Sequence, residues 1–289
     1  MSSGQITRQG IIDALAARDH FPWEVIEGCL SDPDECVPIF LLLLEREARG
    51  LEISPSEGRA CFFATHLLAA LRVTDALAPL TAILCNSPDR ANLLFGDAIG
   101  DSIPMALMGL CAGKADAIWD RVAAPGADWV VREAYLRAWT HEALQERVPP
   151  DLMIERLRGF PSKIAPEPDS YLWAAWMTAI ADLGLSELKP LVESLFQTGH
   201  IARDPFGYLP VDQAAFSEDL AEAALLRQQG TITLASWAQQ KGYRPFAPKE
   251  TDFRHAARHI MALGHSTRQQ HPYPAPLLRV AEPDEDFTP

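Results

Sequence analysis

The feature that most constrains the fold is a helical spacing of apolar residues that runs from Ile6 to about Leu263. A strict alternation of apolar and polar residues over the length of a strand is hard to find anywhere in this span. The sequence therefore predicts an all-α protein. Helices are predicted over residues 6–18, 22–30, 34–49, 56–72, 75–85, 90–110, 116–123, 128–147, 151–159, 170–183, 186–199, 216–229, 231–241 and 252–263, with a kink or break between Gly100 and Pro104.

Short connections and a partial internal repeat predict how these helices are arranged. Loops of a few residues make consecutive helices antiparallel neighbours. A Pro-Leu step at Pro79 returns at Pro190, 111 residues further on, which is three steps of 37. The two middle units match in helix placement and not in residue identity. A period of this length is typical of helical-hairpin repeats. We therefore expect a HEAT-like α-solenoid, a right-handed superhelix of antiparallel hairpins, over residues 1–242.

The character of the sequence changes after residue 242. Residues 243–271 are expected to form a C-terminal helical extension with one last helix. Proline cannot continue a helix, and few apolar residues remain to be buried beyond that point. Residues 272–289 are therefore predicted to form a flexible, Pro-rich acidic tail, which contains Pro272, Pro274, Pro276, Pro283 and Pro289.

Net charge narrows the class of partner. The chain carries 25 Lys and Arg against 39 Asp and Glu, a formal net charge of −14. Residues 243–289 hold six residues of each sign, so the excess of acid lies in residues 1–242. An acidic surface repels a phosphate backbone, which argues against nucleic acid and favours a basic or neutral protein or peptide partner.

Targeting signals and cysteine usage predict the compartment. The N-terminus has no signal-peptide pattern, and no apolar run reaches the about 18 residues of a membrane span, so no membrane is expected as a partner. The cysteines are odd in number and include no C-x-x-C pair. A cytoplasmic protein with reduced, buried thiols is expected, at Cys29, Cys36, Cys61, Cys85 and Cys111.

Three stretches carry a family resemblance: GDAIGDSI at residues 96–103, DSYLWAAWMTAIADL at residues 169–183, and the helix over residues 129–144. Together they resemble the bacterial domain-of-unknown-function family 1186, over roughly residues 10–230. The resemblance implies a helical repeat protein without an established activity. It also implies, for some members, a cysteine-rich metal-binding motif at the end of the chain. That motif is absent here, so a zinc-dependent adaptor role is not carried over.

The best metal-like pattern is His255-Ala-Ala-Arg-His259, whose i, i+4 spacing places two imidazoles on one helix face, with His265 nearby. The glutamate of H-E-x-x-H, which would activate a water, is missing. A solvated polar face is the favoured interpretation. A metal site formed by His255, His259 and His265 is the alternative.

Two further groups are candidates for binding. Asp97 and Asp101, also at i, i+4, could contact a hard cation or a basic partner, or could cap successive helical turns, which we favour. Asp169 and Ser170 are typical of a helix N-terminus. The aromatic residues that follow, Tyr171, Trp173 and Trp176, would belong to the core or, if exposed, would anchor an interface.

No nucleophile elbow, Walker loop or dinucleotide fingerprint occurs in the sequence. We therefore expect no cofactor and favour a non-enzymatic protein-interaction module that uses an acidic solenoid surface. The alternative is a metal-dependent enzyme or metal carrier that uses the histidines or the Asp97 and Asp101 pair.

Overall fold

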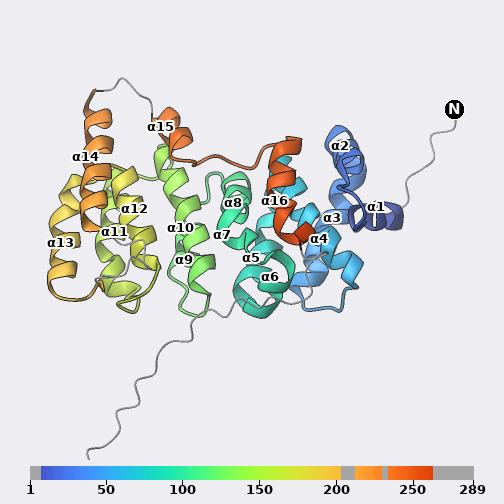
Figure 1. Cartoon of the computed structure of the whole chain (residues 1–289), viewed down its shortest axis with the longest axis horizontal. Coiled ribbons are helices and arrows are strands. Elements are labelled where there is room, and N and C mark those ends of the chain that lie inside the picture. Colours follow the sequence, from blue (N-terminus) through green and yellow to red (C-terminus); the bar gives the residue numbers. More distant parts are fainter. Residues whose placement is uncertain (1–7, 203–211, 230–233, 263–289) are drawn as a thin grey trace, which may run out of the picture.

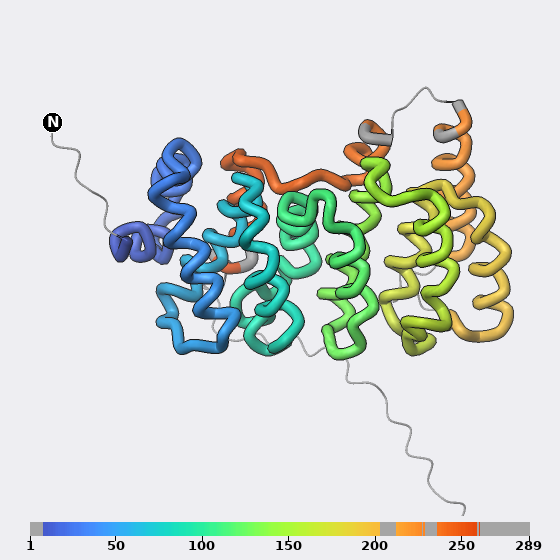
Figure 2. The backbone as a smooth tube through the Cα atoms, turned by 180° about the vertical axis from the view of Figure 1, so that it is seen from behind, coloured from blue at the N-terminus to red at the C-terminus, as the bar shows by residue number. Residues whose placement is uncertain are grey.

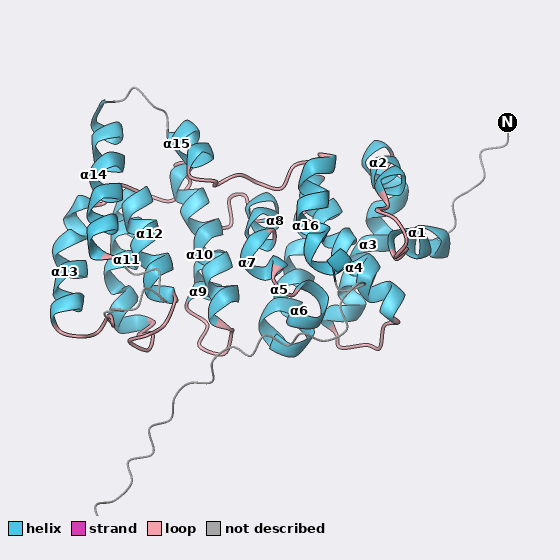
Figure 3. Ribbon diagram, in the orientation of Figure 1, coloured by secondary structure: helices cyan, strands magenta, loops and turns pink. Residues whose placement is uncertain are grey.

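The computed structural model describes residues 8–202, 212–229 and 234–262, and all its regular elements in these ranges are helical (Figure 3). The elements are α1 (Arg8–Leu15), α2 (Trp23–Ser31), α3 (Pro33–Ala48), α4 (Pro55–Ala70), η1 (Thr74–Ala76), α5 (Leu77–Asn86), α6 (Pro88–Phe95), α7 (Ala98–Asp101), α8 (Ile103–Leu110), α9 (Ala115–Val122), α10 (Trp129–Leu144), α11 (Pro150–Lys163), α12 (Leu172–Asp182), η2 (Ser186–Leu188), α13 (Lys189–Gln197), α14 (Gln213–Gln229), α15 (Leu234–Gln240) and α16 (Glu250–Ala262). The predicted all-α class is confirmed.

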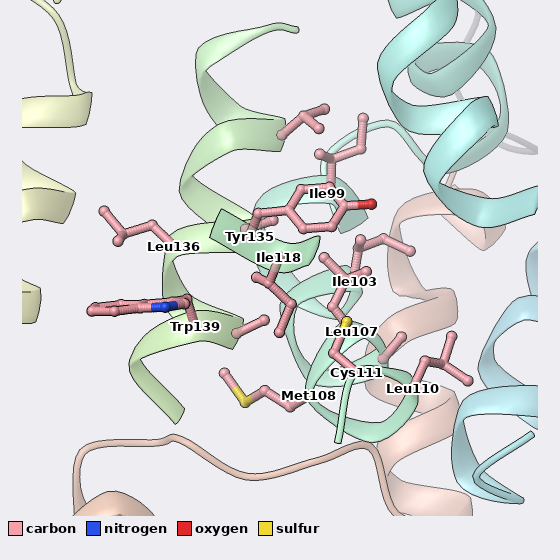
Figure 4. Packing of buried hydrophobic residues seen from close by; sticks show 14 of the residues in the cluster. Ile99, Ile103, Leu107, Met108, Leu110, Cys111, Ile118, Tyr135, Leu136 and Trp139 are labelled. Carbon is pink, nitrogen blue, oxygen red and sulfur yellow. The ribbon is translucent and has the colours of Figure 1, made fainter. Parts of the chain in front are cut away.

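The helices stand beside one another in an elongated row, with α1 and α2 at one end and α13 and α14 at the other (Figure 1). Each long helix packs on neighbours close in sequence: α3 on α4 and α5, α10 on α8 and α9, and α12 on α14. Their apolar faces form one continuous core, of which the junction of α8, α9 and α10 is typical (Figure 4). Leu107, Ile118 and Trp139 belong to the core at this junction. The row is consistent with an α-solenoid, whereas its HEAT-like character stays a prediction.

Four of the long helices end in the same kind of turn. The second residue beyond each helix has a left-handed backbone, with φ near 60°, and the next N–H returns to a carbonyl in the last helical turn. Val73, for example, donates to the Leu68 carbonyl at 2.9 Å. This is the Schellman arrangement, which ends a helix and reverses the chain direction. The left-handed residues are Gly50, Arg72, Glu146 and Gly184, after α3, α4, α10 and α12.

The Pro-Leu repeat corresponds to a recurring piece of structure. After the turns at Arg72 and Gly184, a short 3₁₀ helix leads into a helix that carries the repeated proline, Pro79 in α5 and Pro190 in α13. Proline in the first helical turn leaves no hydrogen bond unmade. The sequence repeat thus marks two equivalent units, α4-η1-α5 and α12-η2-α13.

The long helix predicted over residues 90–110 is wrong in one respect. The break expected between Gly100 and Pro104 is present, at Ser102 between α7 and α8. A second break was missed at Gly96, which ends α6 with a φ of 49°. Glycine adopts this backbone without steric cost, so the chain can change direction there. Three short helices therefore replace the single predicted one.

The C-terminal part of the described chain folds back along the row. From α15, beside α10, an extended segment runs to α16, which packs on α4 and α7 (Figures 1 and 2). The Phe246 amide donates to the Met105 carbonyl at 2.9 Å, and the Phe246 and Phe253 side chains are fully buried. Residues 243–262 therefore cover part of the helical array.

Asp182, the last residue of α12, fastens this returning segment. Its carboxylate accepts a hydrogen bond from the Tyr243 hydroxyl at 2.7 Å, and its carbonyl accepts one from the Trp237 indole at 2.9 Å. Burial raises the pKa of Asp182 to about 6, although the hydrogen bond from Tyr243 acts in the opposite direction.

The predicted tail, residues 272–289, lies outside the described residues. Within the described ranges no helix has the length and apolar content that crossing a bilayer requires.

Candidate functional site

An exposed aromatic pair lies at the beginning of two neighbouring helices. Trp129 is the first residue of α10, and Tyr171 immediately precedes α12. Because α10 packs on α12, the two rings come together and stack, with centroids 4.8 Å apart and planes 22° from parallel. Both side chains stay 38% exposed. They therefore form a preassembled aromatic surface that is partly open to solvent.

A cavity of about 480 Å³ lies beside this pair and includes Trp129 in its wall. Three carboxylates line it, from the first turn of α6 and from the residues that precede α7 and α10: Asp89, Asp97 and Asp128. The Asp128 carboxylate also accepts the Val130 amide at 3.0 Å, which caps α10 and positions Trp129. No Lys or Arg of the described residues lines this cavity. We call it the acidic cavity.

The structure separates the two predicted carboxylates. Asp97 lines the acidic cavity, whereas Asp101 contacts His255 at 2.9 Å and Arg258 at 3.3 Å, both from α16. Asp97 is the N-cap residue of α7, as the capping interpretation expects, although its side chain makes no cap hydrogen bond, whereas the N-cap residue of α8 is Ser102 and not Asp101. Asp101 instead helps to hold α16 in place.

The predicted histidine pair is placed only in part. His255 lies on α16, and its Nε2 faces the Asp101 carboxylate. His265 and the side chain of His259 lie outside the description. Among the described residues, no group of three or more His, Cys, Asp or Glu side chains is placed to hold a metal ion. The metal site therefore stays a hypothesis that rests on the sequence pattern.

The aromatic run after Asp169 divides between core and surface. Trp173 and Trp176 are buried, and their indole N–H groups donate to the Glu167 and Leu157 carbonyls at 2.9 and 2.8 Å. These two residues therefore belong to the core and are no interface anchors. Tyr171 is exposed, as an interface residue must be, and Asp169 is exposed nearby. Trp129 was not predicted as an interface residue. The sequence signal that could have indicated it is Asp128, the capping residue that places Trp129 at the start of α10.

A serine and a histidine also meet inside the array. The His66 Nδ1–H donates to the Phe62 carbonyl, which can only accept, so Nε2 accepts from the Ser102 hydroxyl; both contacts are 2.8 Å. Both residues are 0% exposed, and the Phe246 ring lies 4.8 Å from the imidazole. A pair without solvent access cannot meet a substrate. It ties the α7–α8 junction to α4.

The cysteines are also buried or partly buried. All five are free, four are buried, and Cys85 is partly buried. Burial raises the pKa of every one of these thiols, which keeps them protonated and unreactive.

No curated protein and no solved structure gives a significant match to the chain. The model of a family described as a protein of unknown function (DUF1186) matches residues 8–224. The match covers α1 to most of α14 and leaves α15 and α16 outside it. It confirms the resemblance drawn from the sequence, and the chain belongs to the DUF1186 family.

Proposed function

We propose that this protein is a non-enzymatic interaction module that binds a basic, partly apolar segment of a partner protein at the acidic cavity. The observation that carries the proposal is the exposed stack of Trp129 on Tyr171 at the edge of that cavity. A cytoplasmic location is part of the same proposal.

The aromatic pair suits the centre of an interface. Trp and Tyr are enriched among the residues that carry most of the binding energy in protein complexes. Trp129 and Tyr171 already hold each other in place, so little side-chain entropy remains to be lost on binding. An apolar side chain of the partner would cover the rings, and an Arg or Lys would add a cation–π contact of about 0.5–2 kcal/mol.

The negative charge of the cavity favours a partner segment of positive charge. Asp89, Asp97 and Asp128 line it, and the whole chain carries a net charge of −14. Such a field attracts basic segments, increases their association rate and disfavours acidic ones.

The chain's own α16 supports this kind of recognition. It is held through contacts of His255 and Arg258 with Asp101, while Phe253 packs near Trp23, with ring centroids 6.2 Å apart. A helix that offers His255 and Arg258 to a carboxylate and is anchored by an aromatic side chain thus already binds one face of the array. The acidic cavity offers the same chemistry to a second segment.

A peptide-display library sorted on the immobilised full-length protein tests the proposal. Peptides that combine Arg or Lys with an apolar residue should be enriched, and they should lose binding to a Trp129→Ala/Tyr171→Ala variant. Leu225→Ala is the matched control, because Leu225 is an exposed apolar residue on α14, away from the cavity. Enrichment of acidic peptides, or equal binding to the double variant, would refute the proposal.

A further inference from the structure

A second cavity, of about 340 Å³, also borders α6 but is lined by arginine instead of aspartate. Its wall comes from α4, α6, the loop before α4, the residues after α1 and the end of α16. The apolar part of the wall includes Phe62, Leu93 and Ile260. The polar part includes Arg18, Arg59 and Arg90, so we call it the arginine cavity.

Two of the three arginines make hydrogen bonds within the fold, and Arg59 Nη1 donates to the Ile260 carbonyl at 3.3 Å. Arg90 makes two hydrogen bonds with the Glu47 carboxylate, at 2.7 and 2.6 Å, and is neutralised by it. Arg18 and Arg59 lie close enough for their charges to repel. Burial lowers the pKa of Arg59, and the charge of Arg18 lowers it further. No Asp or Glu in the described part of the chain lines the cavity. In a protein with a net charge of −14, this cationic cavity favours an anion.

The rest of the wall determines the body of the ligand. Leu93 is 77% exposed, the most exposed of the large hydrophobic side chains described, and it borders the cavity together with buried Phe62. Apolar walls with a few convergent polar groups are typical of small-molecule sites, and this volume is near the lower limit of their usual range, about 300–1,000 Å³. The size therefore favours a small ligand over a folded partner.

We propose that the arginine cavity binds a small amphipathic carboxylate, with the carboxylate at Arg18 and Arg59 and an alkyl chain against Phe62, Leu93 and Ile260. Guanidinium groups match the planar carboxylate and form charge-assisted hydrogen bonds with it. The alkyl chain would cover Leu93 and remove apolar surface from water. The site is independent of the acidic cavity, so either proposal can fail without the other.

Substitutions at Gly58 can fill the arginine cavity without changing its charged residues. It lies in the first turns of α4 and lines the cavity, and a Cβ added there would meet Leu94 at 3.6 Å and Ile53 at 3.8 Å, which are ordinary contacts. A small side chain is thus accepted without strain, whereas a leucine would extend into the space of the ligand. Gly58→Leu should therefore block the site while α4 keeps its place in the fold.

Calorimetric titration of the full-length protein with octanoate tests the proposal. One octanoate should bind per chain. Hexanoate, shorter by two methylenes, should bind about 15-fold more weakly, because each buried methylene changes affinity by about fourfold. The neutral 1-octanol should bind at least about tenfold more weakly, since it lacks the charge-assisted hydrogen bonds.

Variants locate the site. Arg18→Gln and Arg59→Gln should each weaken octanoate binding by about 10- to 100-fold. Arg158→Gln removes an equal charge from an exposed position outside the cavity and should leave binding unchanged. Gly58→Leu should abolish binding, and Gly58→Ala, with an unchanged or raised melting temperature, should weaken it. Absence of binding, equal affinity for 1-octanol, or no effect of the Gly58 variants would overturn the proposal.

Discussion

Buried His66 should make the fold sensitive to acid. Its Nδ1–H and its Nε2 lone pair are both used, toward Phe62 and Ser102, and this arrangement requires the neutral imidazole. Burial lowers the pKa of His66 to about 4, while the hydrogen bond to the Phe62 carbonyl and the charge of Asp101 act in the opposite direction. The unfolded chain would instead take up a proton near pH 6.5.

The size of the effect follows from these two pKa values. A histidine whose folded pKa is depressed stabilises the fold fully above about pH 6.5, and this stability is lost as the pH falls toward 4. The complete loss amounts to roughly 3 kcal/mol, of which about 2 kcal/mol has gone at about pH 5. Asp182 has the opposite effect on stability. Because its pKa is raised to about 6, protonation of Asp182 stabilises the fold as the pH falls through 6.

Urea unfolding at about pH 7.5 and about pH 5 measures the contribution of His66, if the wild type is compared with His66→Gln. Glutamine keeps a donor and an acceptor but does not titrate, and Asp182 is present in both proteins, so its effect cancels. The free energy of unfolding of the wild type should fall by about 2 kcal/mol more than that of the variant. An equal fall in both proteins would refute the reasoning.

Three further predictions concern other buried groups. Glu142 is buried and accepts hydrogen bonds from Arg147 and the Gly113 amide at 2.7 Å each; Glu142→Gln should lower the free energy of unfolding by about 3 kcal/mol in urea titrations at neutral pH. Asp182→Asn should slow hydrogen exchange of α15 at neutral pH relative to the wild type, because it removes the cost of a buried charge, and the difference should vanish well below pH 6. A thiol reagent should modify no cysteine rapidly in the folded protein and all five in urea, with Cys85 the first to react under native conditions.

The sequence predicted the helices because their signals are local. The capping box at Ser54 and Glu57 and the left-handed Gly50 are each visible within a few residues. The break at Gly96 was harder to foresee, since a glycine inside an apolar helical pattern does not show whether its φ is positive.

The sites depend on contacts that no local pattern reports. Asp101 and His255 are 154 residues apart and meet because α16 folds back onto α7. Trp129 and Tyr171 stack because α10 packs on α12, while Trp173, only two residues further on, points into the core. Periodicity indicates which face of a helix is buried, but not which exposed residues of two helices become neighbours.

The residues matched by the family model can be compared with the residues that line the two cavities. The matched residues, 8–224, include the acidic cavity and all of the arginine cavity except Ile260 of α16. Segment 243–262 thus adds one wall residue to the arginine cavity and none to the acidic cavity. The two cavities use different residues of α6 and attract ligands of opposite charge.

The change in affinity on Trp129→Ala, measured by fluorescence anisotropy with a basic peptide selected on the full-length protein, tests the proposed function most directly. If the aromatic pair is the centre of the interface, its loss should weaken binding by about 30-fold or more, while Leu225→Ala leaves the affinity unchanged. A change of less than about threefold for Trp129→Ala would place the interface elsewhere and contradict the account.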